Sequence, residues 1–353
     1  MDFTFTEEQQ MMAGAFRDLA ADICSPEALR ALYDGRDTQA EARWQRLADM
    51  GLFGVLAAES DGGMGLGDTD FVLLAEEAGR CALPEPLVEQ AGVAVPALRE
   101  VAVVPEVAAL LPRLACGAAR IAVVHPNNPY ANVPPALTHW LACDAEAVYL
   151  LEARAVEAVA EPSVDAGRRL QRPAAMVPGA APLAGGEEAR ALTERLLSRG
   201  ALFTAAQSLG VAERLLHISV DYAKERHQFG KPIGSYQAIK HHLATVAVKL
   251  EFARAVVYAA VAHVGALGSR SLAAVSHAKL AAADAADLAA RSAIQVHGAM
   301  GYSWEVDLHF YMKRAWALAG AWGDHSFHAR CVQALVCGEA FPLGPDQTFE
   351  RTA

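Results

Sequence analysis

The sequence predicts a mainly helical protein with a small β unit in its middle. Three observations predict this class. Apolar residues recur at helical spacing over the first third of the chain, short apolar runs between proline and asparagine clusters follow, and long alanine-rich stretches with few helix breakers come last. We therefore expect a helical N-terminal domain at 1–115, a β domain at 116–185, a C-terminal four-helix bundle at 186–340 and a tail at 341–353.

The N-terminal domain opens on a helix-capping signal. Residues 6–9 (Thr-Glu-Glu-Gln) fit a capping box, in which the threonine caps backbone amides and the glutamine reaches back to the N-cap amide. A second helix is expected to carry Trp44 and to end at Gly51. After a glycine-rich loop, Asp68 or Thr69 is expected to cap the next helix.

Strands are expected in the middle of the chain and long helices after it. Ile121–Val124 and Ala147–Leu151 are short apolar runs bounded by turn-forming residues, so we predict both as strands. The alanine-rich remainder predicts four helices that pack as an antiparallel bundle, at about 187–223, 234–264, 270–297 and 306–337.

The composition excludes several classes of function. The 353-residue chain is 53% hydrophobic and 20% charged, which is enough apolar material for a large buried core. Its formal net charge of −11 argues against a nucleic-acid partner, because phosphate binding needs a concentrated basic surface. The six cysteines are dispersed without a C-x-x-C pair, so no disulfide framework is expected. Without a signal-peptide pattern or a membrane-spanning apolar run, we expect a cytoplasmic protein.

Two motifs carry a specific family resemblance. Residues 226–240 read Arg-His-Gln-Phe-Gly-Lys-Pro-Ile-Gly-Ser-Tyr-Gln-Ala-Ile-Lys, and residues 295–302 read Gln-Val-His-Gly-Ala-Met-Gly-Tyr. The first resembles the acyl-CoA dehydrogenase signature, R-x-x-F-G-x-P-I followed by an aromatic-Gln pair, and the second resembles the Q-x-x-G-G-x-G-[YF] motif of that family. The opening helix and the Gly-Gly-Met-Gly loop at 62–65 also match. The resemblance covers both ends of the chain and is weak in the middle.

The resemblance implies an FAD site that subunits share. In this family a tetramer is built on the C-terminal bundles, and the two motifs receive the ADP half of a neighbour's FAD. Arginine offers a fork of donors suited to pyrophosphate, and glycine lets a backbone approach a cofactor closely. The implied cofactor-binding residues are Arg226, Phe229, Gln237, Gln295, Gly298 and Ala299, which replaces the second glycine. The alternative roles are a surface ion pair for Arg226, packing for Phe229 and a helix C-cap for Gly298.

The carboxylate that carries out the chemistry of this family is missing from both expected positions. Family members remove hydrogens from the α and β carbons of an acyl-CoA thioester, and a glutamate takes the α-proton. That glutamate either begins the first bundle helix or follows the last long helix, and these positions align with Gly200 and Trp322. Neither residue can accept a proton, so we predict no catalytic base at either position. Asp324 is the candidate substitute.

The segment that holds the flavin ring in relatives has changed as well. Their T-E-P-x-x-G-S is replaced by Val-His-Pro-Asn-Asn-Pro at 124–129, and the strands that follow are shortened. This pattern resembles the smaller subunit of heterotetrameric bacterial acyl-CoA dehydrogenases that act on steroid or other ring-bearing CoA thioesters. The leading hypothesis is a chain that completes the FAD site while a larger homologous subunit supplies the glutamate. The other implied partners are an acyl-CoA substrate and an electron-transfer flavoprotein.

Two alternatives stay open at this point. One is an independent homo-oligomeric acyl-CoA dehydrogenase that uses Asp324 or another acid as a non-standard base. The other is a non-enzymatic structural subunit that has lost contact with the flavin. No metal is expected, because His325 and His328 lie one helical turn apart but no third ligand is visible.

Overall fold

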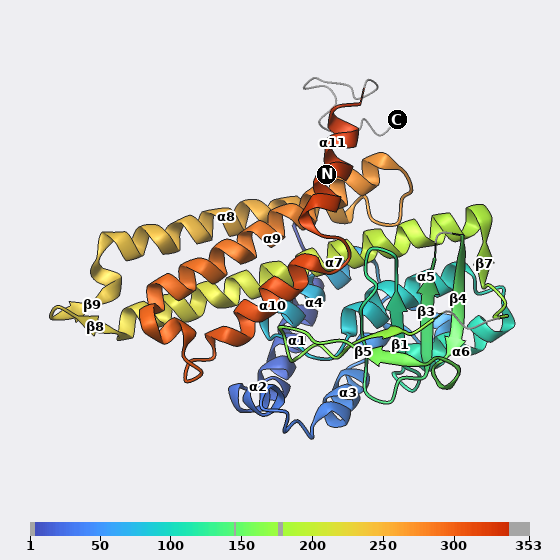
Figure 1. Cartoon of the computed structure of the whole chain (residues 1–353), viewed down its shortest axis with the longest axis horizontal. Coiled ribbons are helices and arrows are strands. Elements are labelled where there is room, and N and C mark those ends of the chain that lie inside the picture. The colour runs from blue at the N-terminus through green and yellow to red at the C-terminus, as the bar shows by residue number, and fades with distance from the viewer. Residues whose placement is uncertain (1–3, 145, 176–178, 339–353) are drawn as a thin grey trace.

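The computed structural model describes residues 4–144, 146–175 and 179–338. The N-terminal part is helical, the middle part forms small sheets, and long helices make up the C-terminal part (Figure 1). The predicted class, mainly helical with a small β unit, is therefore confirmed. The predicted tail at 341–353 lies outside the described residues.

The regular elements of the described N-terminal part, residues 4–115, are all helices, as predicted. They are α1 (Glu7–Ile23), α2 (Pro26–Tyr33), α3 (Ala40–Asp49), α4 (Asp68–Arg80), a π-helical segment (Val88–Ala94) that continues into α5 (Val95–Glu100), and α6 (Pro105–Ala115). The capping box of α1 is confirmed, because the Gln9 amide donates to Thr6 Oγ1 over 3.2 Å and the Thr6 amide donates to Gln9 Oε1 over 2.9 Å.

Two details of the N-terminal prediction need correction. Helix α2 was not predicted, although Ser25 caps it and Pro26 occupies its first position, both of which favour a helix start. Neither Asp68 nor Thr69 caps α4. Gly67 is the N-cap residue, and its amide donates to the Asp70 carboxylate over 2.8 Å. A glycine has no side chain to act as a cap, so the third helical residue satisfies the free amide instead.

The β unit contains both predicted strands. Strand β1 (Ile121–Val124) pairs parallel with β3 (His139–Cys143), which pairs antiparallel with β4 (Ala147–Glu152), and β4 pairs with β7 (Ala184–Gly185). A second sheet has the order β2 (Ala131–Asn132), β6 (Leu170–Pro173) and β5 (Ala158–Ala160). The four-stranded sheet packs on α7 and on the π-helical segment.

Five α-helices form the C-terminal part within the described residues, 186–338. They are α7 (Gly186–Glu225), α8 (Gln237–Val261), α9 (Ser269–His297), α10 (Leu308–Gly320) and α11 (His325–Val336). Helix α7 runs from the β unit to the opposite end of the molecule, where it meets the small hairpin of β8 (His227–Gln228) and β9 (Lys231–Pro232) (Figure 1). Among the described residues, no helix has both the length and the apolar content that crossing a bilayer requires.

The predicted helix at 306–337 is wrong in one respect, because it is two helices. The chain breaks between α10 and α11, where Trp322 (φ 57°) and Gly323 (φ 99°) both adopt left-handed backbone conformations. The predicted start near 234 is also wrong. Residues 233–235 form a 3₁₀ turn, and α8 begins at Gln237.

Small residues let the long helices approach one another closely. Helix α9 buries a run of alanines against its neighbours, which explains the alanine-rich composition of this part of the chain. Where α4 crosses α7, Gly79 and Gly210 bring the two backbones together. A Cβ at Gly210 would lie 1.9 Å from the carbonyl oxygen of Glu76, and a Cβ at Gly79 would lie 1.9 Å from that of Gln207. The crossing joins the N-terminal part to the bundle.

Replacing Gly210 by alanine should lower the free energy of unfolding by at least about 1–3 kcal/mol, because backbone atoms of α4 occupy the space of the new methyl group. Gly14 is the matched control, since it lies within α1 with no neighbour within 4 Å. Gly14→Ala should raise the stability by roughly 0.5–1 kcal/mol through helix propensity. Urea denaturation of both variants checks this, and equal effects would contradict the close crossing.

Candidate functional site

The two sequence motifs meet in one pocket at the end of the bundle farthest from the β unit. We call it the hairpin-end pocket, because it lies beside β8 (His227–Gln228) and β9 (Lys231–Pro232). Its volume is about 540 Å³. Five of the six predicted cofactor-binding residues line it, namely Arg226, Phe229, Gln295, Gly298 and Ala299. Gln237, the sixth, is the exposed first residue of α8 and is not a lining residue.

A tight hairpin presents the first motif. Phe229 (φ 53°) and Gly230 (φ 82°) form its two-residue turn, and left-handed conformations at both positions are typical of a type I′ turn. Arg226 ends α7 in an extended conformation and is exposed. Within the described residues no carboxylate pairs with its guanidinium. The alternative role of Arg226 in a surface ion pair is therefore not supported there. Phe229 is 91% exposed, so it is not part of the core, and its ring lies edge-on to Tyr236 with ring centroids 6.4 Å apart.

Gly298 ends α9 with a backbone that requires glycine. Its φ is 60° and its ψ is −135°, and its amide donates to the Ile294 carbonyl. The predicted C-cap role is therefore confirmed, and it coexists with a place in the pocket wall. The exposed Gln295 side chain comes from the last turn of the same helix.

His297 is a pocket residue that the sequence interpretation missed. It is 4% exposed, stacks on Tyr222 with ring centroids 4.1 Å apart, and its Nδ1 lies 2.8 Å from the Ala293 carbonyl oxygen. The carbonyl can only accept, so Nδ1 carries the proton and Nε2 has a free lone pair. Nε2 is buried and has no partner within the described chain. Burial lowers the pKa of His297 and favours this neutral form. The position of this histidine within the Gln-Val-His-Gly motif was the sequence feature that could have indicated it as a pocket residue.

These features fit the ADP half of an FAD. The pocket offers an unpaired guanidinium for pyrophosphate oxygens and a buried ring nitrogen that can accept a hydrogen bond from a hydroxyl or amino group. Tyr222 and Tyr236 add aromatic surface for a base or sugar. Buried polar atoms are normally hydrogen-bonded, so the unpaired His297 Nε2 in the wall of this pocket indicates that a ligand supplies the donor.

The two predicted base positions touch one another, although they are far apart in sequence. Gly200 lies on α7 and Trp322 lies in the break between α10 and α11. A Cβ on Gly200 would lie 2.1 Å from Cδ2 of the Trp322 indole. Gly200 is buried and Trp322 is only 1% exposed, so the ring fills the space beside the glycine. Neither residue can accept a proton, since glycine has no side chain and indole is only a donor.

The altered segment at 124–129 closes over the indole. The Asn128 side chain accepts a hydrogen bond from the Trp322 amide over 3.2 Å, and the Asn127 carbonyl accepts one from the Gly323 amide over 2.9 Å. The His125 ring centroid lies 5.9 Å from that of Trp322. His125 and Asn128 are both buried. The segment that aligns with a flavin-ring site therefore hydrogen-bonds to the backbone between α10 and α11, and its histidine lies beside the indole.

A buried histidine contacts the backbone of Trp322. His328 is fully buried, with Nε2 2.9 Å from the Trp322 carbonyl oxygen and Nδ1 2.9 Å from Ser276 Oγ. Burial lowers its pKa to about 4, and the nearby Lys279 adds to the effect, so the ring is neutral at pH 7. Both nitrogens are occupied by these contacts. No group of three metal-ligating side chains occurs among the residues that the structure describes.

Asp324 has a structural function. It is the N-cap of α11, and its carboxylate accepts a hydrogen bond from the Phe327 amide over 2.8 Å. The residue is exposed, whereas Trp322 two residues earlier is buried. A general base for a weakly acidic carbon needs partial desolvation, and an exposed capping carboxylate lacks that environment.

Comparison with known proteins identifies the family. The acyl-CoA dehydrogenase C-terminal domain matches residues 189–334, and the acyl-CoA dehydrogenase N-terminal domain matches residues 6–118. The acyl-CoA dehydrogenase IpdE2 of Mycolicibacterium smegmatis is 31% identical over 332 residues, covering 94% of this chain and 99% of its own length. The chain therefore belongs to the acyl-CoA dehydrogenase family, whose members bind FAD.

Solved structures that contain two different chains share the fold. The ChsE4-ChsE5 complex from Mycobacterium tuberculosis contains a chain with a TM-score of 0.82 and 25% identity, covering 97% of this chain and all of that one. A chain of the Tcur3481-Tcur3483 steroid ACAD has a TM-score of 0.79 and 24% identity, covering 95% of this chain and 99% of its own. Relatives with this fold thus include members of heteromeric complexes.

The contact between Gly200 and Trp322 can be tested with a double-mutant cycle. Gly200→Ala should destabilise the wild-type chain by about 1–3 kcal/mol, because the methyl group and the indole would overlap. In a Trp322→Ala background the same change should cost much less, since the ring is gone. Urea unfolding of the four proteins gives the coupling energy. Additive effects would contradict the contact.

Proposed function

We propose that this chain is the smaller subunit of a heteromeric FAD-dependent acyl-CoA dehydrogenase. It completes the FAD site, while a larger homologous partner supplies the catalytic glutamate. The observation that carries the proposal is the packing of the Trp322 indole on Gly200, which occupies the space at both expected positions of the catalytic glutamate. The hairpin-end pocket, in contrast, is open and lined by residues of both motifs.

The residues of this chain would bind and position the cofactor. When bound, FAD supplies the hydride acceptor for α,β-desaturation of an acyl-CoA thioester. Arg226 would donate to the pyrophosphate, and its charge would offset part of the phosphate charge. His297 Nε2 would accept a hydrogen bond from the nucleoside, and its stacking on Tyr222 fixes the ring for that contact. Gly298 lets the backbone approach the cofactor closely.

Abstraction of the α-proton would fall to the partner chain. Gly200 and Trp322 cannot take a proton, and the buried indole leaves no room for an acyl chain beside them. We propose a ring-bearing acyl-CoA as the substrate class, because the similar fold occurs in a steroid ACAD. Electrons would pass to an electron-transfer flavoprotein, and the complex would work in the cytoplasm.

Removing Arg226 should strip FAD from the assembled complex. We expect Arg226→Ala to weaken FAD binding at least about tenfold, because it removes a charge-assisted contact. The complex is made by co-expressing this chain with the larger homologue, and flavin per assembly is read from the absorbance spectrum. Lys224→Ala is the control, since Lys224 is an exposed cation two residues away that pairs with Asp221. A flavin-saturated, active preparation of this chain alone would overturn the proposal.

Asp324→Asn should leave turnover of the complex unchanged. Asparagine caps helices as well as aspartate does, so α11 keeps its cap while the carboxylate is lost. Steady-state rates with a fixed acyl-CoA substrate check the expectation. A large loss of kcat with normal flavin content would instead support Asp324 as a base and an independent dehydrogenase.

A further inference from the structure

A second cavity lies between α1, α4, α7 and α10 and has no part in the FAD site. Its volume is about 510 Å³, within the roughly 300–1,000 Å³ range of small-molecule sites. We call it the Arg214 pocket after the α7 residue in its wall. Arg214 precedes Arg226 by 12 residues, which is about 18 Å along a helix axis. The two pockets share no lining residue.

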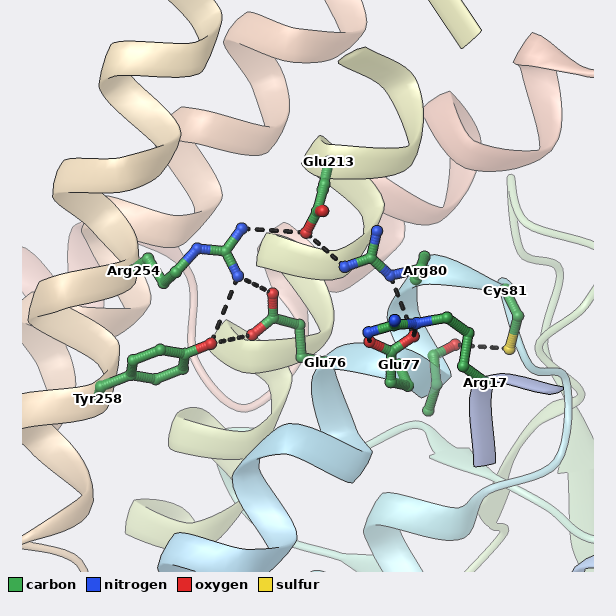
Figure 2. Close-up of polar contacts among 9 residues, drawn as sticks. Arg17, Glu76, Glu77, Arg80, Cys81, Glu213, Arg254 and Tyr258 are labelled. Carbon is green, nitrogen blue, oxygen red and sulfur yellow. Dashed lines mark hydrogen bonds and ion pairs between the residues drawn. The ribbon is translucent and has the colours of Figure 1, made fainter. Parts of the chain in front are cut away.

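Both carboxylates of the Arg214 pocket are already occupied by arginines (Figure 2). Glu77 accepts hydrogen bonds from Arg17 Nη2 over 2.6 Å and from Arg80 Nε over 3.0 Å. Glu213 accepts from Arg80, and from Arg254 Nη2 over 3.0 Å. Burial raises the pKa of Glu213, but its contacts with Arg80 and Arg254 outweigh burial and lower that pKa overall. Glu213 is therefore charged at neutral pH, and both carboxylates are engaged by arginines.

Arg214 is the arginine in this wall without a carboxylate. No acidic side chain pairs with it anywhere in the part of the chain that the structure describes. It is half-buried, and its guanidinium carbon lies 5.5 Å from the centre of the Tyr311 ring. The wall thus holds three arginines, Arg17, Arg80 and Arg214, against two glutamates. One positive charge is left without an acidic partner, and a guanidinium has five N–H donors to offer.

The rest of the wall is largely apolar and small. Ala20, Ala21 and Pro26 come from α1 and the start of α2, and the Tyr311 ring from α10. A ligand that fits must therefore combine a negative group with a compact apolar body. A monoanion would neutralise the surplus charge, whereas a doubly charged phosphate would add a net negative charge close to Glu77 and Glu213. The wall therefore favours a carboxylate over a phosphate.

We propose that the Arg214 pocket is a second ligand site, which binds a small organic carboxylate with a compact apolar body. The carboxylate pairs with the Arg214 guanidinium, where two parallel N–H donors match its two oxygens. The apolar body lies against Ala20, Ala21 and Pro26. The site requires neither FAD nor a partner chain, so it stands or falls separately from the dehydrogenase function.

Benzoate is the probe, titrated calorimetrically into the full-length chain in a low-chloride buffer. We expect a dissociation constant on the order of 1 mM or tighter. Benzamide, which has the same shape without the charge, should not bind. Inorganic phosphate should bind more weakly than benzoate. Arg214→Gln should weaken benzoate binding at least about tenfold, because it removes the charge-assisted pair.

Two further variants separate the site from general effects. Ala21→Phe adds bulk at an exposed position of the wall and should block benzoate without disturbing the core. Arg190→Gln is the matched control, because Arg190 is an exposed arginine on the same helix outside the pocket, and it should leave binding unchanged. Three results would each overturn the proposal. They are a wild-type chain that does not bind benzoate, an Arg214→Gln or Ala21→Phe variant that binds benzoate as tightly as the wild type, and phosphate binding as tight as that of benzoate.

Discussion

The contact between the Trp322 indole and the backbone of Gly200 is the constraint on which the rest of the site depends. Any side chain at 200 would overlap the ring, so α7 must present a glycine there. The ring reaches this position only because α10 and α11 are separated by two left-handed residues. That break is costly for a bulky residue. It is held by hydrogen bonds that Asn127 and Asn128 accept from the Trp322 and Gly323 amides and by the contact of His328 with the Trp322 carbonyl. Trp322 and Gly323 thereby connect the bundle to the β unit through their contacts with His125, Asn127 and Asn128.

The two ends of α7 differ in how far their surroundings are buried. Near Gly200 the side chains of Trp322, His125 and Asn128 are buried, although Trp322 Nε1 and His125 Nε2 have no hydrogen-bond partner within the described chain. Near Arg226 the polar groups are exposed or unsatisfied, including a guanidinium without a carboxylate and a buried histidine nitrogen without a donor. The Gly200 end is therefore closed to solvent, whereas the Arg226 end presents polar groups at an open pocket.

The sequence was sufficient where the signal was local. The capping box of α1, strand β1 and the extent of α7 follow from residue patterns within a few positions. It was insufficient where distant residues decide the outcome. The α10–α11 break depends on Asn128, which lies 194 residues from Trp322 in sequence. His297 was missed because a histidine in a helix becomes distinctive only when its second nitrogen is seen to lack a partner. The overlap of Gly200 with Trp322 likewise requires the tertiary structure.

The length of α7 has a consequence for how such a chain can evolve. Gly200 and Arg226 are 26 residues apart on one continuous helix, which is about 39 Å. A span of that length is greater than one dinucleotide can bridge, so the filled site and the open pocket of a single chain would serve different cofactor molecules. Natural selection can then act on them separately. A gene duplicate could lose its own reaction centre to an aromatic residue and still be retained, because the contribution to its neighbour would be untouched.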